Sequence, residues 1–160
     1  MAVVLTFETL KNRKNNFPVS TEKVDRKSLV LVVEDHDDSR FMLKQLLESW
    51  NYNVAEAKDG VEAVCKFVSE RPDLILMDVE LPRLNGFAAT EHIRQHNAHN
   101  KVPIIFLSAC AELAAQKQAE VAGGDDYLVK QLNLAQLKST LEKRLKQVTS
   151  QNILSLKRFG

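Results

Sequence analysis

The chain has 160 residues, of which 44% are hydrophobic and 27% are charged, and its formal net charge is +1. This length suits one ordinary globular domain with a sizeable core. No stretch approaches the roughly eighteen consecutive apolar residues of a membrane span, and the N-terminal segment lacks the features of a secretory signal. We therefore predict a cytoplasmic protein with no membrane span.

The charge is unevenly distributed along the chain. Residues 28–131 contain 10 Lys and Arg against 17 Asp and Glu, a net charge of −7. Residues 1–27, with 6 basic and 3 acidic groups, and residues 132–160, with 6 and 1, together contribute +8. An acidic middle suits a cation site, whereas basic ends are usually solvated. Since the basic ends carry no recognisable nucleic-acid motif, we do not expect nucleic acid as a partner.

The two cysteines, Cys65 and Cys110, have no metal-type spacing and lie among apolar residues. This pattern predicts free core thiols in a reducing compartment. A disulfide between them is not expected.

Five short apolar stretches alternate with five helical patterns. Residues 1–27 are polar and predicted to form a flexible arm, and residues 28–148 form the ordered domain. Residues 149–160 are expected to be a C-terminal tail. The strands are predicted at residues 28–33, 52–57, 73–78, 102–108 and 126–130.

Each predicted helix has a start signal or an apolar stripe. Asp37 or Asp38 can cap the first helix, and Asp59 followed by Glu62 forms a capping-box pattern before the second. The stripe of the first helix is Phe41, Met42, Leu46, Leu47 and Trp50, and that of the second is Val61, Val64, Cys65 and Val68. The third and fourth helices are predicted at about 86–97 and 111–122.

The last helix is predicted from about Asn133, and one of its faces carries leucines. These apolar residues are Leu134, Leu137, Leu141, Leu145 and Val148. Most of this face is expected to be core. The apolar pattern continues farther than one domain needs, so docking on a partner or on a second subunit, as in a homodimer, is an alternative.

Strands that alternate with helices predict right-handed βαβ units and a parallel sheet with helices on both faces. Ligands bind such folds beyond the carboxyl ends of the strands. The polar residues at these ends are Glu34, Asp35, Asp78, Glu80, Ser108 and Lys130. Neighbouring carboxylates repel one another unless a divalent cation neutralises them, and Mg²⁺ prefers such oxygen ligands. An ionised Asp beside Mg²⁺ can attack a phosphoryl group, so the set predicts phosphoryl chemistry.

These residues resemble the receiver domain of two-component response regulators, in the manner of chemotaxis regulators. The resemblance covers about residues 28–148. It rests on four motifs in order: LVVEDHDDSR, DLILMDVELPRLNGF, PIIFLSA and AGGDDYLVK. It implies a flavodoxin-like α/β fold, a doubly wound five-stranded parallel sheet in the order 2-1-3-4-5 with five helices.

The resemblance also implies a role for each matched residue. Asp78 is the expected phosphate acceptor, and Glu34 and Asp35 the acidic pair that holds Mg²⁺ together with it. The other matches are the backbone carbonyl of Glu80 for the metal, Ser108 and Lys130 for the phosphoryl group, and Tyr127 for a rotamer switch. Where the family usually has proline after the lysine, this chain has Gln131, so we expect an altered loop and a trans bond there.

The implied function is a switch rather than an enzyme. A sensor histidine kinase or phosphotransfer protein phosphorylates Asp78, and the face formed by the fourth helix, fifth strand and fifth helix then binds a downstream protein. We expect no DNA-binding output domain, because only one helix and a short tail follow the fifth strand.

Two alternatives stay open. A pseudo-receiver would bind its partner constitutively, and only Gln131 favours it. An Mg²⁺-dependent hydrolase of the haloacid dehalogenase type also uses an Asp nucleophile, but it needs a second Asp where this chain has Glu80.

Overall fold

The computed structural model describes residues 26–96, 102–131 and 133–157, with side chains described up to residue 150. A five-stranded sheet in the order β2-β1-β3-β4-β5 forms its centre, and every pairing is parallel. The strands are β1 Leu29–Val33, β2 Asn53–Ala57, β3 Leu74–Asp78, β4 Ile104–Ser108 and β5 Asp126–Val129. This arrangement confirms the predicted fold class and strand order.

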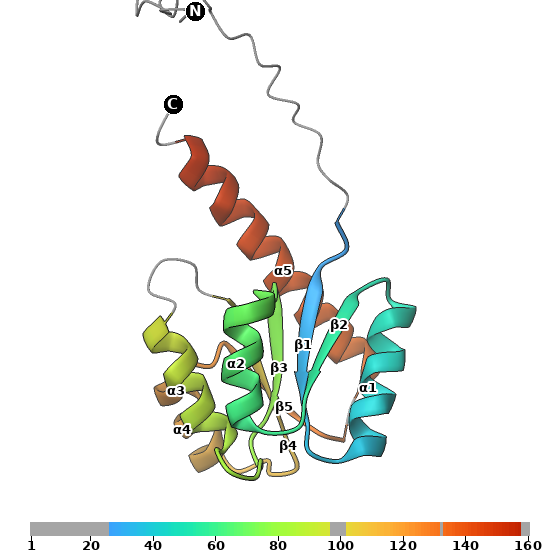
Figure 1. Ribbon diagram of the computed structural model, residues 1–160, viewed down its shortest axis with the longest axis vertical. Coiled ribbons are helices and arrows are strands. Elements are labelled where there is room, and N and C mark those ends of the chain that lie inside the picture. Colours follow the sequence, from blue (N-terminus) through green and yellow to red (C-terminus); the bar gives the residue numbers. More distant parts are fainter. Residues whose placement is uncertain (1–25, 97–101, 132, 158–160) are drawn as a thin grey trace, which may run out of the picture.

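Five helices cover the two faces of the sheet (Figure 1). They are α1 Asp37–Ser49, α2 Gly60–Glu70, α3 Gly86–His96, α4 Leu113–Ala122 and α5 Leu134–Lys157. Helices α2, α3 and α4 lie on one face, and α1 and α5 lie on the other. Because all strands are parallel, their carboxyl ends lie at the same edge of the sheet, at the bottom of Figure 1.

The core consists of two apolar layers, one on each face of the sheet. Alternate residues of a strand point to opposite faces, so Leu31 and Val33 pack with α2, α3 and α4, whereas Val30 and Val32 pack with α1 and α5. The strands are buried on both faces, which explains why they are continuous apolar runs rather than alternating ones.

Helix α1 differs from its prediction in its cap and in its buried face. His36 occupies the N-cap position and no side chain caps the helix there; Asp37 and Asp38 lie in the first turn. Leu43 and Leu47 are buried, whereas two residues of the predicted stripe, Phe41 and Met42, are exposed. The predicted stripe was therefore partly wrong, because its first two positions lie on the solvent side of the helix.

Helix α2 is also rotated relative to its predicted stripe. Asp59 caps it as predicted, since its carboxylate accepts the N–H of Glu62 at 2.9 Å. Gly60 and Ala63 face the core, however, and Cys65 is exposed. The prediction that Cys65 is a core thiol was wrong, because small residues rather than the β-branched ones let this helix approach its neighbours. Both cysteines are free, as predicted.

Helix α5 extends past the predicted end of the domain. It runs without a break through residue 148, where the domain was predicted to end, and the carbonyl oxygen of the Asn133 side chain caps its first turn. Leu137 and Leu141 are buried, whereas Leu134 is exposed. Figure 1 shows the last turns of α5 extending past the amino-terminal ends of the strands.

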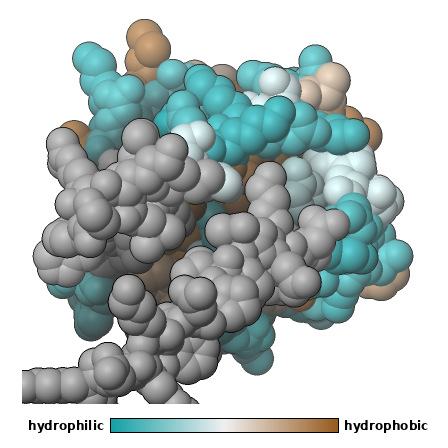
Figure 2. Space-filling view, turned by 90° about the horizontal axis from the view of Figure 1, so that it is seen from above, coloured by the Kyte–Doolittle hydropathy of each residue, from teal (hydrophilic) through white to brown (hydrophobic). Residues whose placement is uncertain are grey.

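That end of the molecule is mostly hydrophilic where Figure 2 shows it in colour, with hydrophobic surface at the margin and in the hollow near the centre. The predicted arm, 1–27, lies largely outside the described residues; within them, Arg26 forms an ion pair with Asp73 at 2.8 Å. Of the helices that the structure describes, none has the length and hydrophobicity that crossing a membrane requires.

Candidate functional site

Four strands deliver the predicted site residues to one edge of the sheet. Glu34 follows β1, Asp78 and Ser108 are the last residues of β3 and β4, and Lys130 follows β5. The parallel register pairs Asp78 with Leu107 of the neighbouring strand, so these ends stand at similar heights. Glu34, Asp78 and Ser108 are each at most 4% exposed. Such burial is unusual for the carboxylates of Glu34 and Asp78 unless they have a cationic partner.

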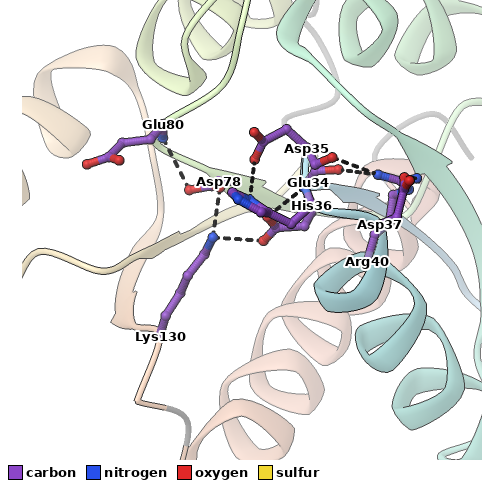
Figure 3. A network of polar contacts seen from close by, with 8 residues as sticks. All are labelled: Glu34, Asp35, His36, Asp37, Arg40, Asp78, Glu80 and Lys130. Atoms are coloured by element: carbon purple, nitrogen blue, oxygen red, sulfur yellow. Dashed lines mark hydrogen bonds and ion pairs between the residues drawn. The ribbon is translucent and has the colours of Figure 1, made fainter.

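Lys130 is that cationic partner. Its Nζ lies 2.7 Å from Oδ2 of Asp78 and 2.8 Å from Oε2 of Glu34, so one ammonium bridges two buried carboxylates (Figure 3). The second oxygen of Asp78 accepts the backbone N–H of Glu80 at 3.1 Å. The two carboxylates and the ammonium form a compact, charge-compensated group at the end of the sheet.

Burial and charge shift two pKa values in this group. Burial raises the pKa of Asp78 above the usual Asp value, and the nearby Glu34 adds to this rise, although the hydrogen bond and charge of Lys130 oppose it. For Lys130, burial lowers the pKa, but hydrogen bonds to Asp78 and Glu34 outweigh burial, and the net pKa is raised. The lysine therefore remains charged at neutral pH.

Asp35 lies beside this group on the solvent side, with about a third of its side chain exposed (31%). Nδ1 of His36 lies 3.0 Å from its Oδ1 and 3.5 Å from Oε1 of Glu34. The charge of Asp35, together with this hydrogen bond, raises the pKa of His36 above the usual histidine value. His36 is exposed at the rim of the site, and its imidazole contacts both carboxylates of the acidic pair.

Arg40 is a site residue for which the sequence analysis gave no role. Its guanidinium donates to the backbone carbonyls of Glu34 at 2.8 Å and of Asp35 at 3.3 Å, and it also pairs with Asp37. These bonds fix the turn that carries the acidic pair (Figure 3). The sequence signal for this role was the position of Arg40, a basic residue in the first turn of the helix that follows Glu34 and Asp35.

Ser108, the last residue of β4, and Tyr127, in β5, are both hydrogen-bonded to Cys110. The Ser108 hydroxyl accepts the N–H of Cys110 at 3.1 Å. The Tyr127 hydroxyl donates to the carbonyl of the same Cys110 at 2.6 Å. The loop after β4 is thus bonded to both residues that were predicted to respond to phosphorylation.

The loop from β3 to α3 contributes backbone rather than side chain to the site. The Glu80 side chain is exposed and points away from Asp78 in Figure 3. A Cβ on Gly86 would lie 2.1 Å from the carbonyl oxygen of Asp78, so only glycine allows this close approach of the loop. On the other side of the site, the Lys130–Gln131 peptide is trans, as expected.

An ion pair between the buried Asp59 and the largely exposed Arg83 ties this loop to α2. Nε of Arg83 donates to Oδ2 of Asp59 at 2.9 Å, and a second guanidinium nitrogen contacts the same oxygen. Asp59 is 2% exposed, and its burial raises its pKa. Bonds from the Glu62 N–H and from Arg83 outweigh burial, so that the net pKa is lowered. Sequence analysis identified the cap but missed Arg83.

The donor atoms at this edge fit Mg²⁺. Glu34, Asp35 and Asp78 provide carboxylate oxygens only, the ligand type that a hard divalent cation prefers. The Lys130 ammonium, which bridges Glu34 and Asp78, shows that these carboxylates accept a positive charge between them. Asp35 is half-buried, so the group is open to solvent on the side where Asp35 lies.

Comparisons of the chain with family models and with curated proteins agree on one family. Residues 30–142 match the family model of the response regulator receiver domain. The chain is 36% identical over 118 residues to the transcriptional regulatory protein YxdJ of Bacillus subtilis, and the match covers 71% of this chain and 50% of that protein.

Solved structures show the same similarity. The chemotaxis protein CheY4 of Vibrio cholerae has 30% identity and a TM-score of 0.69, covering 74% of this chain and 98% of its own. The receiver domain of the sensor histidine kinase PA1611 of Pseudomonas aeruginosa has 35% identity and a TM-score of 0.70, covering 76% and 99%. That structure has a magnesium ion coordinated in its active-site cleft.

The chain belongs to the response regulator receiver-domain family of two-component signalling. This confirms the resemblance drawn from the four motifs. The chain spans 50% of the length of each of the first two curated relatives, both transcriptional regulatory proteins.

Proposed function

We propose that Asp78 accepts a phosphoryl group from the phosphohistidine of a sensor kinase or phosphotransfer protein, and that the chain acts as a switch. The observation that carries this proposal is the bridging position of Lys130 between two buried carboxylates at the strand ends. A cap or a solvated surface Asp needs neither burial nor a cation from a strand so distant in sequence.

In the transfer step, an oxygen of the ionised Asp78 carboxylate forms a bond to phosphorus while the phosphorus–nitrogen bond of the donor breaks. The histidine nitrogen leaves with the electron pair of the broken bond. Lys130 then pairs with the phosphoryl oxygens, and the buried Ser108 hydroxyl is available to donate to one of them. The product is an aspartyl-phosphate.

Glu34, Asp35 and Asp78 would hold Mg²⁺, with the backbone carbonyl of Glu80 as a further ligand. When bound, Mg²⁺ offsets the charge that accumulates on the transferring phosphoryl oxygens. Arg40 orients the acidic pair through the backbone carbonyls of Glu34 and Asp35, which keeps both carboxylates at the end of β1.

The switch would act through the loop after β4. Phosphorylation adds about −1.5 to −2 units of charge beside Ser108 and Lys130. If Ser108 turns toward the phosphoryl group, it gives up its bond with the Cys110 N–H, and the Tyr127 bond to the same residue is free to change. The face formed by α4, β5 and α5 would then bind a downstream protein.

The wider biology is part of the same proposal. We expect the chain to be a signalling module rather than an enzyme with turnover, and the free, exposed Cys65 supports a reducing compartment such as the cytoplasm. The expectation that no DNA-binding domain accompanies it stays a prediction.

The decisive experiment is the intact mass of the protein after incubation with acetyl phosphate and Mg²⁺. One added phosphoryl group in the wild type, absent from Asp78→Asn and from a sample with excess chelator, supports the proposal. No adduct, combined with no binding of beryllofluoride, would favour the pseudo-receiver. Multiple turnover of a small phosphoester would favour the hydrolase.

A further inference from the structure

His36 is the residue at the site that the proposed function does not use. It follows the acidic pair directly, at the N-cap position of α1, and its side chain is 76% exposed. Its backbone N–H donates to Oε1 of Glu34 at 3.3 Å, which anchors the residue on the carboxylate side of the turn. The imidazole therefore lies at the open face of the cluster.

The donor atoms of Glu34, Asp35 and His36 lie within 4.8 Å of one another, one from each residue. Nδ1 of His36 is 3.0 Å from Oδ1 of Asp35 and 3.5 Å from Oε1 of Glu34. With metal–ligand bonds of about 2.0–2.2 Å, neighbouring ligands of an octahedral or tetrahedral ion lie about 3.0–3.5 Å apart. The imidazole nitrogen therefore already has, from each carboxylate, the separation that ligands of a shared cation have.

We propose that Nδ1 of His36 is a ligand of the divalent cation at this site; this inference rests on the proposed function, which places the cation there. This imidazole makes the site take first-row transition ions such as Co²⁺ and Zn²⁺ more tightly than a carboxylate-only site would. Carboxylates and water suit Mg²⁺, whereas an imidazole nitrogen adds affinity mainly for transition ions.

The geometry also explains how His36 can bind the cation without disturbing the phosphorylation chemistry. Lys130 pairs with Oε2 of Glu34, whereas Nδ1 of His36 lies 3.5 Å from Oε1, so the two side chains approach different oxygens of this carboxylate (Figure 3). The exposed imidazole leaves the remaining coordination positions to water or to phosphoryl oxygens. The competing interpretation is a simple ion pair between an imidazolium and Asp35, which would give His36 no preference among cations.

The test compares the affinities of Co²⁺ and Mg²⁺ for the full chain, for His36→Ala and for His92→Ala, measured by calorimetry at one fixed pH. His92 is an exposed histidine on α3, away from the cluster, and serves as the matched control. We expect His36→Ala to weaken Co²⁺ binding by about tenfold or more, a scale typical of changes around metal ligands. Its Mg²⁺ affinity should stay within about twofold, because Mg²⁺ gains little from nitrogen ligands.

A spectroscopic readout separates ligation from general electrostatics. With Mn²⁺ bound, pulsed electron paramagnetic resonance should detect a coupled histidine nitrogen in the wild type and in His92→Ala, and lose it in His36→Ala. Equal Co²⁺ affinity in all three proteins, or an equal loss for both ions in His36→Ala, would overturn the inference. If the wild type binds neither ion, the metal site of the proposed function fails as well. If the wild type binds Mg²⁺ and is phosphorylated but His36→Ala leaves its Co²⁺ affinity unchanged, only the role of His36 fails.

Discussion

Nζ of Lys130 lies 2.7 Å from Oδ2 of Asp78, although the two residues are 52 positions apart in the sequence. Asp78 is the last residue of β3 and Lys130 follows β5, and strand β4 lies between these two strands in the sheet. The contact therefore exists only because three parallel strands end at the same height. It neutralises a buried carboxylate that burial alone would push toward its protonated form.

Removing the lysine should make the protein depend on a metal ion for stability. Lys130→Ala leaves Asp78 and Glu34 buried without a cation. We expect the free energy of unfolding to fall by up to about 3 kcal/mol. This is the low end of the range for a broken buried ion pair, because Lys130 is partly solvated. Mg²⁺ should then raise the melting temperature more in the variant than in the wild type. Thermal unfolding with and without Mg²⁺ measures both effects.

The matched control for that variant is Lys117→Ala, which removes an exposed lysine from α4. It should change neither the stability nor the response to Mg²⁺. If Lys130→Ala and the wild type gain the same stabilisation from Mg²⁺, the lysine and the metal do not neutralise the same carboxylates.

The cap of α2 should be worth a measurable part of the stability. Asp59→Ala removes the acceptor for the Glu62 N–H and leaves the Arg83 guanidinium without its carboxylate. We expect a loss of about 1–2 kcal/mol, the upper part of the range for an N-cap. Chemical denaturation measures it, and Asp59→Asn should lose less because the amide oxygen can still cap the helix.

The contribution of Asp59 should also depend on pH with a definite sign. Its pKa is lowered in the folded protein, so its charged form stabilises the fold above the ordinary Asp pKa of about 3.9. The stability difference between the wild type and Asp59→Asn should be constant near neutral pH and shrink as the pH falls from about 4 through the lowered folded-state pKa. A difference that grows on acidification would contradict this assignment.

The close approach at Gly86 should be sensitive to a single methyl group. In Gly86→Ala, the new Cβ would meet the carbonyl oxygen of Asp78, which belongs to the backbone and cannot rotate away. We expect a loss of about 1–3 kcal/mol, as for other overpacked positions, and slower phosphorylation because the loop that carries Glu80 must shift. Gln95→Ala, on the exposed face of the same helix, should change neither quantity.

Tyr127 can be tested through the bond that it makes. Tyr127→Phe removes the hydroxyl that donates to the Cys110 carbonyl, at a cost of about 0.5–1.5 kcal/mol in the unphosphorylated protein. If phosphorylation releases this bond, the same substitution should cost less in the beryllofluoride-bound form. Equal costs in both forms, from parallel denaturation curves, would show that Tyr127 is structural and not part of a switch.

Much of the fold was predictable because its signals are local. Continuous apolar runs such as that of β1 predict buried parallel strands, and the Asp59–Glu62 spacing predicts the cap that the structure contains. The faces of the helices were less predictable. Phe41, Met42 and Cys65 are exposed despite their helical spacing, because the rotation of a helix is set by what packs against it.

The sequence by itself determined which residues stand at the strand ends, since strand length and direction follow from the order of apolar runs and helices. Only the tertiary structure decided which of these side chains touch. The bridge from Lys130 to Glu34 and Asp78, and the roles of Arg40 and His36, depend on strand register and on backbone bonds within the turns. Such contacts join residues far apart in the chain or depend on one rotamer, and no local pattern specifies either.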